Sequence, residues 1–196
     1  MKIGIMGGTF DPIHIGHLLA GEAARDAYGL DQVWFMPSHI PPHKHQAGAS
    51  GKERLEMTSE AVAGHPAFEV LDIEVLRGGV SYTIDTIKEL QELHSAVDFY
   101  FIIGADMVNY LPHWQGIEEL AQRICFIGVR RPGFQLALDE LPHYLQDKVL
   151  LADMPVVDIS STDIRERAAE GRTIRYLVPD RVHDYITRGG LYEVQP

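Results

Sequence analysis

Short apolar segments alternate along this chain with longer stretches that have the spacing of amphipathic helices, and this alternation constrains the fold more than any other feature. The segments rich in β-branched and aromatic residues are predicted to be strands: Lys2 to Met6, Val33 to Met36, Phe68 to Val75, Phe99 to Ile103, Ile124 to Val129 and Val149 to Val157. The predicted helices between them are Gly16 to Tyr28, Gly51 to Gly64, Tyr82 to His94, Ile117 to Gln122, Ser161 to Glu170 and Pro179 to Arg188. This order predicts an α/β fold, an open parallel sheet with helices on both faces. Ligands of such sheets bind beyond the carboxyl ends of the strands.

Composition limits the partners of this fold. The 196 residues, 45% of them hydrophobic, predict a single domain over 1–196 with a short helical C-terminal part from about 161. The net charge of -11 argues against nucleic acid and anionic membranes as partners. One cysteine, Cys125, is expected to be a buried strand residue and excludes an intrachain disulfide. With no long apolar span and no export signal, we expect a cytoplasmic protein, and a homodimer is left open.

The segment from Gly7 to His17, GGTFDPIHIGH, joins the first predicted strand to the first predicted helix. Helix N-termini carry unpaired N–H groups and partial positive charge, and Gly7 and Gly8 let the backbone approach an anion. His14 and His17 are three residues apart, so both can face one phosphate. The segment therefore predicts a phosphate site with two imidazoles. Two alternatives stay open, ordinary structural histidines and a zinc site with Asp11 as third ligand.

Other nucleotide motifs are absent, and a second candidate phosphate segment lies far away. Neither G-x-G-x-x-G nor G-K-S/T follows the first strand, which argues against an ordinary dehydrogenase or a phosphate-loop ATPase. Ile159 to Arg165 reads ISSTDIR at the start of a predicted helix. Its serines suit helix capping, but the Arg165 guanidinium suits the fork geometry of a phosphate.

The two segments together resemble the nucleotidyltransferase superfamily. Thr9, His14, Gly16 and His17 match its (T/S)-x-(G/H)-H turn, and Ile159 to Arg165 matches its I-S-S-T-x-I-R segment. The resemblance implies a Rossmann-like sheet and transfer of a nucleotidyl group from a nucleoside triphosphate with release of pyrophosphate. It implies catalytic roles for His14, His17 and Arg165, and ATP contacts from Gly7, Gly8, Thr9, Phe10, Gly16, Gly104, Asp106, Ile159, Ser160 and Ser161.

The acceptor is indicated by SYTIDT, from Ser81 to Thr86, after the turn at Gly78 and Gly79. This segment resembles S-Y-T-x-D-T of the pyridine mononucleotide adenylyltransferases, and the resemblance to the bacterial nicotinate mononucleotide adenylyltransferases extends from Lys2 to about Gly190. It implies acceptor contacts from Ser38, His39, Lys44, Tyr82, Thr83 and Trp114. A helix cap at SYTIDT and a core position for Trp114 are the structural alternatives.

This resemblance implies a reaction of ATP with nicotinate mononucleotide that gives nicotinate adenine dinucleotide and pyrophosphate, a step of NAD biosynthesis. Mg²⁺ is expected to be carried with ATP, and no metal site of the protein's own is expected. Alternatives are a nicotinamide mononucleotide or phosphopantetheine acceptor, and a non-catalytic nucleotide sensor. A metal site at His39, His43 and His45 is a further alternative, weighed against solvated surface histidines.

Overall fold

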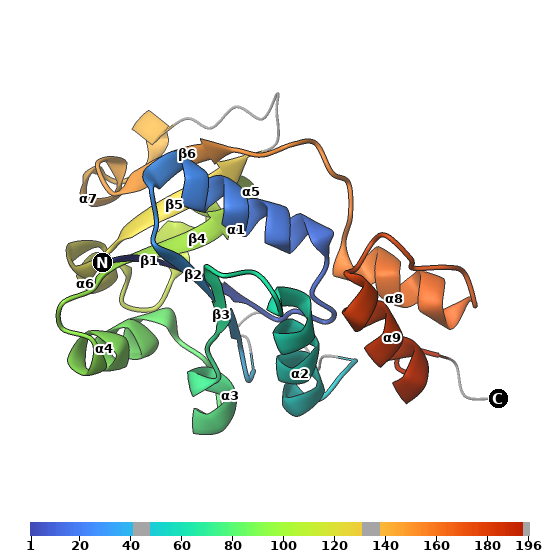
Figure 1. The fold of residues 1–196 in the computed structure, drawn as a ribbon. Helices are drawn as coiled ribbons and strands as arrows, with labels where there is room; N and C mark the ends of the chain where they lie inside the picture. The colour runs from blue at the N-terminus through green and yellow to red at the C-terminus, as the bar shows by residue number, and fades with distance from the viewer. Residues whose placement is uncertain (41–47, 131–137, 194–196) are drawn as a thin grey trace.

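A computed structural model describes residues 1–40, 48–130 and 138–193 of the chain. Within these residues, six strands form one parallel sheet in the order β3-β2-β1-β4-β5-β6 (Figure 1). The strands are β1 (Lys2–Gly8), β2 (Gln32–Pro37), β3 (Phe68–Val70), β4 (Asp98–Gly104), β5 (Cys125–Arg130) and β6 (Val149–Asp153). The prediction of an open parallel α/β sheet is therefore confirmed.

The strand order reverses at β1, whose two neighbours are β2 and β4. Ile5 is in register with Trp34 on one side and with Phe101 on the other. Because β2 and β4 continue away from β1 in opposite directions, the loops after β1 and β4 diverge and leave a crevice at the carboxyl end of the sheet. The predicted phosphate turn and Gly104 lie on the two sides of this switch point.

Helices cover both faces of the sheet. They are α1 (Ile15–Tyr28), α2 (Gly51–Val62), α3 (Ile73–Arg77), α4 (Thr83–Leu93), α5 (Ala105–Val108), α6 (Ile117–Arg123), α7 (His143–Gln146), α8 (Ser161–Ala169) and α9 (Asp180–Gly189), with 3-10 turns at Leu111–His113 and Leu138–Glu140. One apolar core joins the sheet to α1, α2, α8 and α9, and the other joins it to α4, α5, α6 and α7. The period-2 alternation of strands explains the division, since Phe101 and Ile103 face the second core while Ile102 faces the first.

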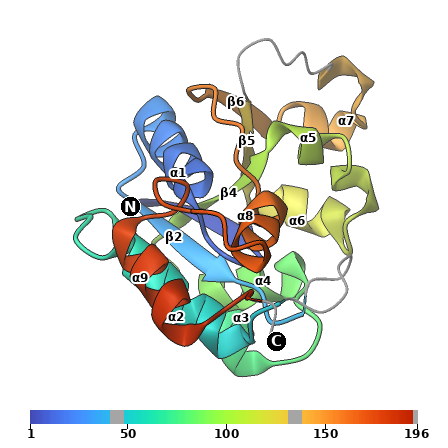
Figure 2. The same ribbon diagram turned by 90° about the vertical axis from the view of Figure 1, so that its right-hand side faces the viewer.

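Helix α9 lies beside α2 in both ribbon views (Figures 1 and 2), and α8 precedes α9 in the chain. Ile164 of α8 and Val182 and Ile186 of α9 are fully buried in the first core. Apolar burial of this extent fixes the pair against the rest of the domain, because each such side chain contributes about 1.5–3 kcal/mol when removed from water. The segment that carries ISSTDIR is thereby held close to the turn after β1.

Two predicted strands are shorter than expected, and one expected burial is wrong. Strand β3 ends at Val70, and residues 73–77 form α3, because the edge strand pairs with β2 only up to Phe35. Strand β6 ends at Asp153, two residues before Pro155, which has no N–H for a further ladder bond. Cys125 lies in β5 as predicted but is only half-buried. No helix among the described residues is long and apolar enough to cross a membrane.

Candidate active site

The turn after β1 is packed around two aromatic rings. Phe10 is 2% exposed and has a positive φ of 49°, and its ring fills the space beside Gly8. A Cβ atom on Gly8 would lie 2.8 Å from that ring, and one on Gly7 would lie 2.7 Å from Phe101. The two glycines are thus required by close packing of aromatic rings, a reason that the phosphate interpretation of the sequence did not contain.

His14 and His17 lie together where α1 begins. Their rings are stacked with centroids 3.7 Å apart, and the Phe10 and His17 rings are nearly perpendicular with centroids 5.0 Å apart. The backbone N–H of His14 donates to Nδ1 of His17 at 3.2 Å. Since Nδ1 accepts, the proton of the neutral His17 ring is on Nε2, which makes Nε2 a hydrogen-bond donor.

A cavity of about 400 Å³ opens at the switch point. It brings together residues from the ends of three strands, β4, β5 and β6, and from α1 and α5. Its lining consists of His14, Gly16, Ala20, Gly104, Ala105, Asp106, Val129, Met154, Val157 and Ile159. The aliphatic part suits a flat heterocycle, and the imidazole and carboxylate give it polar contacts at the rim. Five residues predicted to bind ATP or to act in catalysis therefore line one cavity: His14, Gly16, Gly104, Asp106 and Ile159.

A second cavity of about 350 Å³ is lined by Ser81, Tyr82, Thr83, Met107, His113, Trp114 and Gln115. Three of these residues, Tyr82, Thr83 and Trp114, were predicted to bind the acceptor. Trp114 follows the 3-10 turn and also packs edge-on against Phe101 and Phe126, with centroids 5.7 and 6.2 Å away. Trp114 therefore packs against the aromatic core and also lines the cavity.

Helix α5 is a common wall of the two cavities. Ala105 and Asp106 line the first and Met107 lines the second. Gly104 caps this helix, and a Cβ atom there would lie 2.5 Å from the Asp106 carboxylate. Since neighbouring residues of α5 line both, the two cavities are adjacent.

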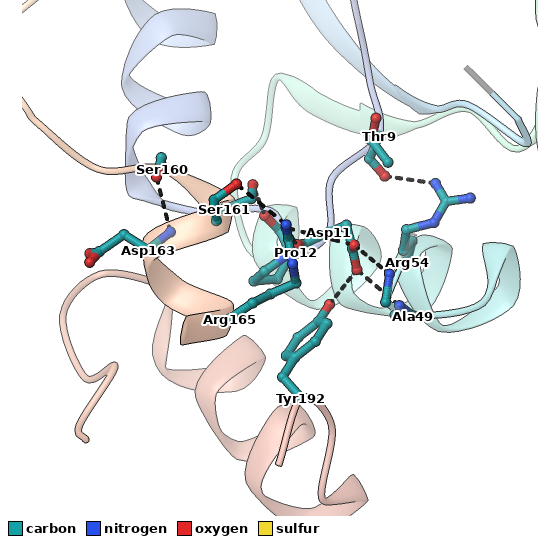
Figure 3. A network of polar contacts seen from close by, with 12 residues as sticks. Thr9, Asp11, Pro12, Ala49, Arg54, Ser160, Ser161, Asp163, Arg165 and Tyr192 are labelled. Carbon is teal, nitrogen blue, oxygen red and sulfur yellow. Dashed lines mark hydrogen bonds and ion pairs between the residues drawn. The ribbon is translucent and has the colours of Figure 1, made fainter. Parts of the chain in front are cut away.

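The ISSTDIR segment contacts the turn after β1 directly (Figure 3). The Ser161 hydroxyl donates to the carbonyl oxygen of Pro12 at 2.9 Å, and Nη1 of Arg165 donates to that of Asp11 at 2.7 Å. Ser160 caps α8 by accepting from the N–H of Asp163 at 3.0 Å. The structural role that the sequence allowed for Ser160 is present, and Arg165, one-third exposed, lies beside the predicted phosphate turn.

Two predicted acceptor residues follow β2. The backbone N–H of Ser38 donates to the carbonyl oxygen of Gly8 at 2.9 Å, and that of His39 donates to the Ser81 hydroxyl at 3.1 Å. Their backbone thus connects the phosphate turn to the SYTIDT segment. Lys44, His43 and His45 lie outside the described residues. Among residues 1–40, 48–130 and 138–193, no three His, Cys, Asp or Glu side chains gather as metal ligands.

Asp11, considered from sequence only as a zinc ligand, is the centre of a buried network (Figure 3). Its carboxylate, 5% exposed, accepts from the backbone N–H groups of Gly48 at 2.7 Å and Ala49 at 3.0 Å and from the Tyr192 hydroxyl at 2.8 Å. Nη1 of Arg165 is 3.7 Å from the same carboxylate. A side chain with these donors is a structural anion rather than an open metal ligand.

Arg54 is a second residue that sequence analysis missed. It is 1% exposed, and Nη1 donates to the carbonyl oxygens of Thr9 and Ser38, both at 2.7 Å, while Nη2 donates to that of His39 at 3.0 Å. Burial lowers the pKa of its guanidinium, an effect opposed by the nearby charge of Asp11. The sequence signal was an arginine in the apolar stripe of a helix, three residues before the buried Met57.

Glu74 is a buried charged residue next to the segment that lines the second cavity, as Arg54 is next to the turn after β1. It is 3% exposed, and its carboxylate accepts from the Thr86 hydroxyl at 2.8 Å and lies 3.8 Å from the guanidinium of Arg77. Burial raises the pKa of Glu74, while hydrogen bonds from Thr86 and Ser81 and the charge of Arg77 oppose that rise. Because Glu74 was placed in a predicted strand, its contact with the start of α4 could not be foreseen.

Comparisons with known proteins agree with this geometry. Residues 5–167 match the model of the cytidylyltransferase-like family. A probable nicotinate-nucleotide adenylyltransferase of Geobacillus kaustophilus is 50% identical over 192 residues, which cover 97% of this chain and 86% of the relative. The nicotinate-nucleotide adenylyltransferase of Bacillus subtilis is 46% identical over 193 residues, 98% of both chains. A similar solved structure is the Plasmodium falciparum nicotinic acid mononucleotide adenylyltransferase complexed with NaAD, with a TM-score of 0.77, 24% identity and 97% coverage of both chains.

Proposed function

Since the chain belongs to the cytidylyltransferase-like family, and its full-length relatives carry the name nicotinate-nucleotide adenylyltransferase, we propose that it joins the AMP part of ATP to nicotinate mononucleotide. The products are nicotinate adenine dinucleotide and pyrophosphate, and the reaction belongs to NAD biosynthesis. Membership of a nucleotidyltransferase family follows from the match over residues 5–167 and from identity of about half over nearly the whole chain.

The observation that carries this proposal is the pair of cavities with α5 as common wall. The cavity with Gly104, Asp106 and Ile159 receives the adenosine part of ATP, and the cavity with Tyr82, Thr83 and Trp114 receives the pyridine nucleotide. The indole face suits stacking on a pyridine ring, and the first N–H groups of α4 suit its carboxylate. A dinucleotide product has two heterocycles joined through phosphates, which is the arrangement these cavities offer.

The chemistry needs no general base. A phosphate monoester has a second pKa of about 6, so the acceptor phosphate is largely dianionic near neutral pH. One of its oxygens forms a bond to the α-phosphorus of ATP while the bond to the bridging β-phosphate oxygen breaks, and that electron pair leaves with pyrophosphate. Holding two polyanions in line and stabilising the charge of the leaving group account for the catalysis.

The turn after β1 supplies the charge stabilisation. With Nδ1 occupied by the backbone of His14, the Nε2–H of His17 is the donor that we assign to the α-phosphate, and His14 is assigned to the β-phosphate. Arg165 adds a permanent positive charge beside the turn. Mg²⁺ enters with ATP as part of the substrate, held by phosphate oxygens and water.

The reaction is placed in the cytoplasm as part of the same proposal. The chain has one cysteine and so cannot form an intrachain disulfide, which is typical of proteins in a reducing compartment.

A pyrophosphate-release assay tests the function. Purified protein is supplied with ATP and Mg²⁺ and with nicotinate mononucleotide, nicotinamide mononucleotide or phosphopantetheine in separate reactions. We expect the fastest release with nicotinate mononucleotide and none with phosphopantetheine. Release with another acceptor alone would replace the substrate assignment, and ATP binding without release for any of the three would favour a nucleotide sensor.

A further inference from the structure

The C-terminal segment after α9 reaches the turn that carries His14 and His17. Gly190 ends α9 in the left-handed conformation, the N–H of Leu191 donates to the carbonyl oxygen of Ile186 at 3.1 Å, and Tyr192 follows with a positive φ of 68°. A positive φ is uncommon for a bulky residue and requires support from surrounding contacts. Here the support is the bond from the Tyr192 hydroxyl to the Asp11 carboxylate.

The Tyr192 ring contributes as well as its hydroxyl. A Cβ atom on Gly48 would lie 3.2 Å from Cε1 of Tyr192 and 3.4 Å from Cδ of Arg165. The aromatic ring, the Gly48 backbone and the aliphatic stem of Arg165 therefore surround the same small space. Because Gly48 also donates to Asp11, Tyr192, Gly48, Arg165 and Asp11 form one packed unit.

Three donors hold the carbonyl groups of the turn, and one of them, Arg165, belongs to this unit. The carbonyl oxygen of Thr9 accepts from Arg54, that of Asp11 from Arg165 and that of Pro12 from Ser161. Carbonyl oxygens that faced a bound triphosphate would repel it, whereas oxygens held by these donors point into the protein and leave the N–H side of the turn for the anion. Arg165 thus has two functions, one toward the backbone of the turn and one toward the ligand.

We propose that Tyr192 is a positioning residue of the transfer site, which acts through Asp11 to hold Arg165 and the turn after β1 in the arrangement that binds the triphosphate of ATP. This assignment deepens the proposed function and rests on it. Burial and the Asp11 carboxylate raise the pKa of the Tyr192 phenol, so the hydroxyl is protonated and able to donate near neutral pH.

Tyr192→Phe tests the proposal, because it removes the hydroxyl and keeps the ring. A hydrogen bond to a charged group corresponds to about a tenfold effect, so we expect the dissociation constant of ATP to rise about tenfold and kcat to fall. The KM for nicotinate mononucleotide should change less than twofold. Tyr185→Phe is the matched control: Tyr185 lies on α9, and its hydroxyl donates to Glu56 instead of Asp11, so ATP binding should not change.

A double-mutant cycle separates positioning from a purely structural role. ATP affinity is measured by equilibrium binding without acceptor for wild type, Tyr192→Phe, Arg165→Ala and the double variant, each with its melting temperature. If Tyr192 acts through Arg165, the tyrosine substitution has at least threefold less effect on affinity in the Arg165→Ala background. Equal effects in both backgrounds, or a lower melting temperature with unchanged ATP affinity, would overturn the proposal.

The two proposals fail in distinguishable ways. Binding of ATP is measured without turnover, so the cycle gives its answer even if nicotinate mononucleotide is not the acceptor. Normal pyrophosphate release by the wild type together with unchanged ATP binding by Tyr192→Phe would overturn the positioning role alone. No release by the wild type would overturn the proposed function, whatever the cycle gives.

Discussion

The cavity assigned to ATP and the cavity assigned to the acceptor are supported by contacts of different range. The first depends on bonds between residues far apart in the sequence, with Ser161 to Pro12 separated by 149 positions, Arg165 to Asp11 by 154 and Tyr192 to Asp11 by 181. Behind the second, Thr86 and Glu74 are 12 positions apart, and His39 and Ser81 are 42 apart.

The difference in range indicates which substitutions should change ligand binding in each cavity. The acceptor cavity is built mostly from one stretch, from α3 to the segment before α6, and its buried anion Glu74 comes from that stretch. The cavity assigned to ATP is lined by His14, which directly follows the turn that α8 and the segment after α9 contact. Substitutions in the docking contacts should therefore change ATP binding selectively, and substitutions around Glu74 should change acceptor binding selectively.

The largest effect is expected for His17→Ala. Loss of a preorganised donor to transition-state charge lowers turnover by on the order of 10² or more. Steady-state pyrophosphate release measures this, with the KM for nicotinate mononucleotide expected to change little. His183→Ala on α9, paired with Asp184 at the surface, is the control, and an unchanged turnover number for His17→Ala would remove its catalytic assignment.

Asp11→Asn comes next, because it leaves the shape of the side chain and removes its charge. The amide cannot accept from all of Gly48, Ala49 and Tyr192, so we expect the free energy of unfolding to fall by about 2 kcal/mol. The dissociation constant of ATP should rise by about tenfold or more. Urea unfolding and equilibrium ATP binding provide the measurements. Asp153→Asn, which breaks an exposed pair with Arg130, should leave both unchanged. Acceptor KM rising as much as ATP KM would contradict the division between the cavities.

Trp114→Ala tests the other side of the comparison. Removing the stacking face should raise the KM for nicotinate mononucleotide about tenfold and leave that for ATP within twofold. The melting temperature should also fall, since Trp114 packs on Phe101 and Phe126. Trp114→Phe keeps an aromatic face and should recover most of the acceptor affinity; a KM that stays at the wild-type value in Trp114→Ala would show that the ring does not bind the acceptor.

Glu74→Gln should have the smallest effect on turnover and a clear effect on stability as pH changes. The folded-state pKa of Glu74 is raised above 4.5 by burial, so the folded protein holds this proton more tightly than the unfolded chain. Wild type should therefore lose stability relative to Glu74→Gln as pH rises from about 4.5 through the folded-state pKa, by at most about 1.4 kcal/mol per pH unit. Urea unfolding of both proteins across this range measures it, and a difference that grows with pH in favour of wild type would contradict the sign.

The sequence predicted the parts of both cavities that depend on short motifs. Glycine-rich and hydroxyl-rich segments at strand ends indicate backbone that a ligand can approach closely. In the structure, Gly16, Gly104 and Ile159 line one cavity, and Tyr82 and Thr83 line the other. The roles of these residues toward ATP and the acceptor stay predictions. Lys44 lies outside the described residues, so its place relative to the second cavity is a prediction too.

The supporting network could not be predicted, because it depends on tertiary packing. Nothing near Tyr192 in the sequence indicates that its hydroxyl reaches Asp11, and the local pattern from Phe68 to Val75 suits a strand as well as the observed break and helix. Whether Glu74 is a surface residue of a strand or a buried anion under α4 is decided by Thr86 and Arg77, which become neighbours only in the fold.

Gly8 has no side chain, yet its position affects the orientation of the His17 imidazole through the Phe10 ring. The Phe10 ring occupies the space where a methyl group of alanine would lie, and the same ring packs perpendicular to the His17 imidazole. A methyl group at Gly8 would displace the Phe10 ring, and we expect that displacement to shift the His17 imidazole packed against it. If His17 is the donor we propose, a substitution at Gly8 should lower the reaction rate more than it lowers the melting temperature.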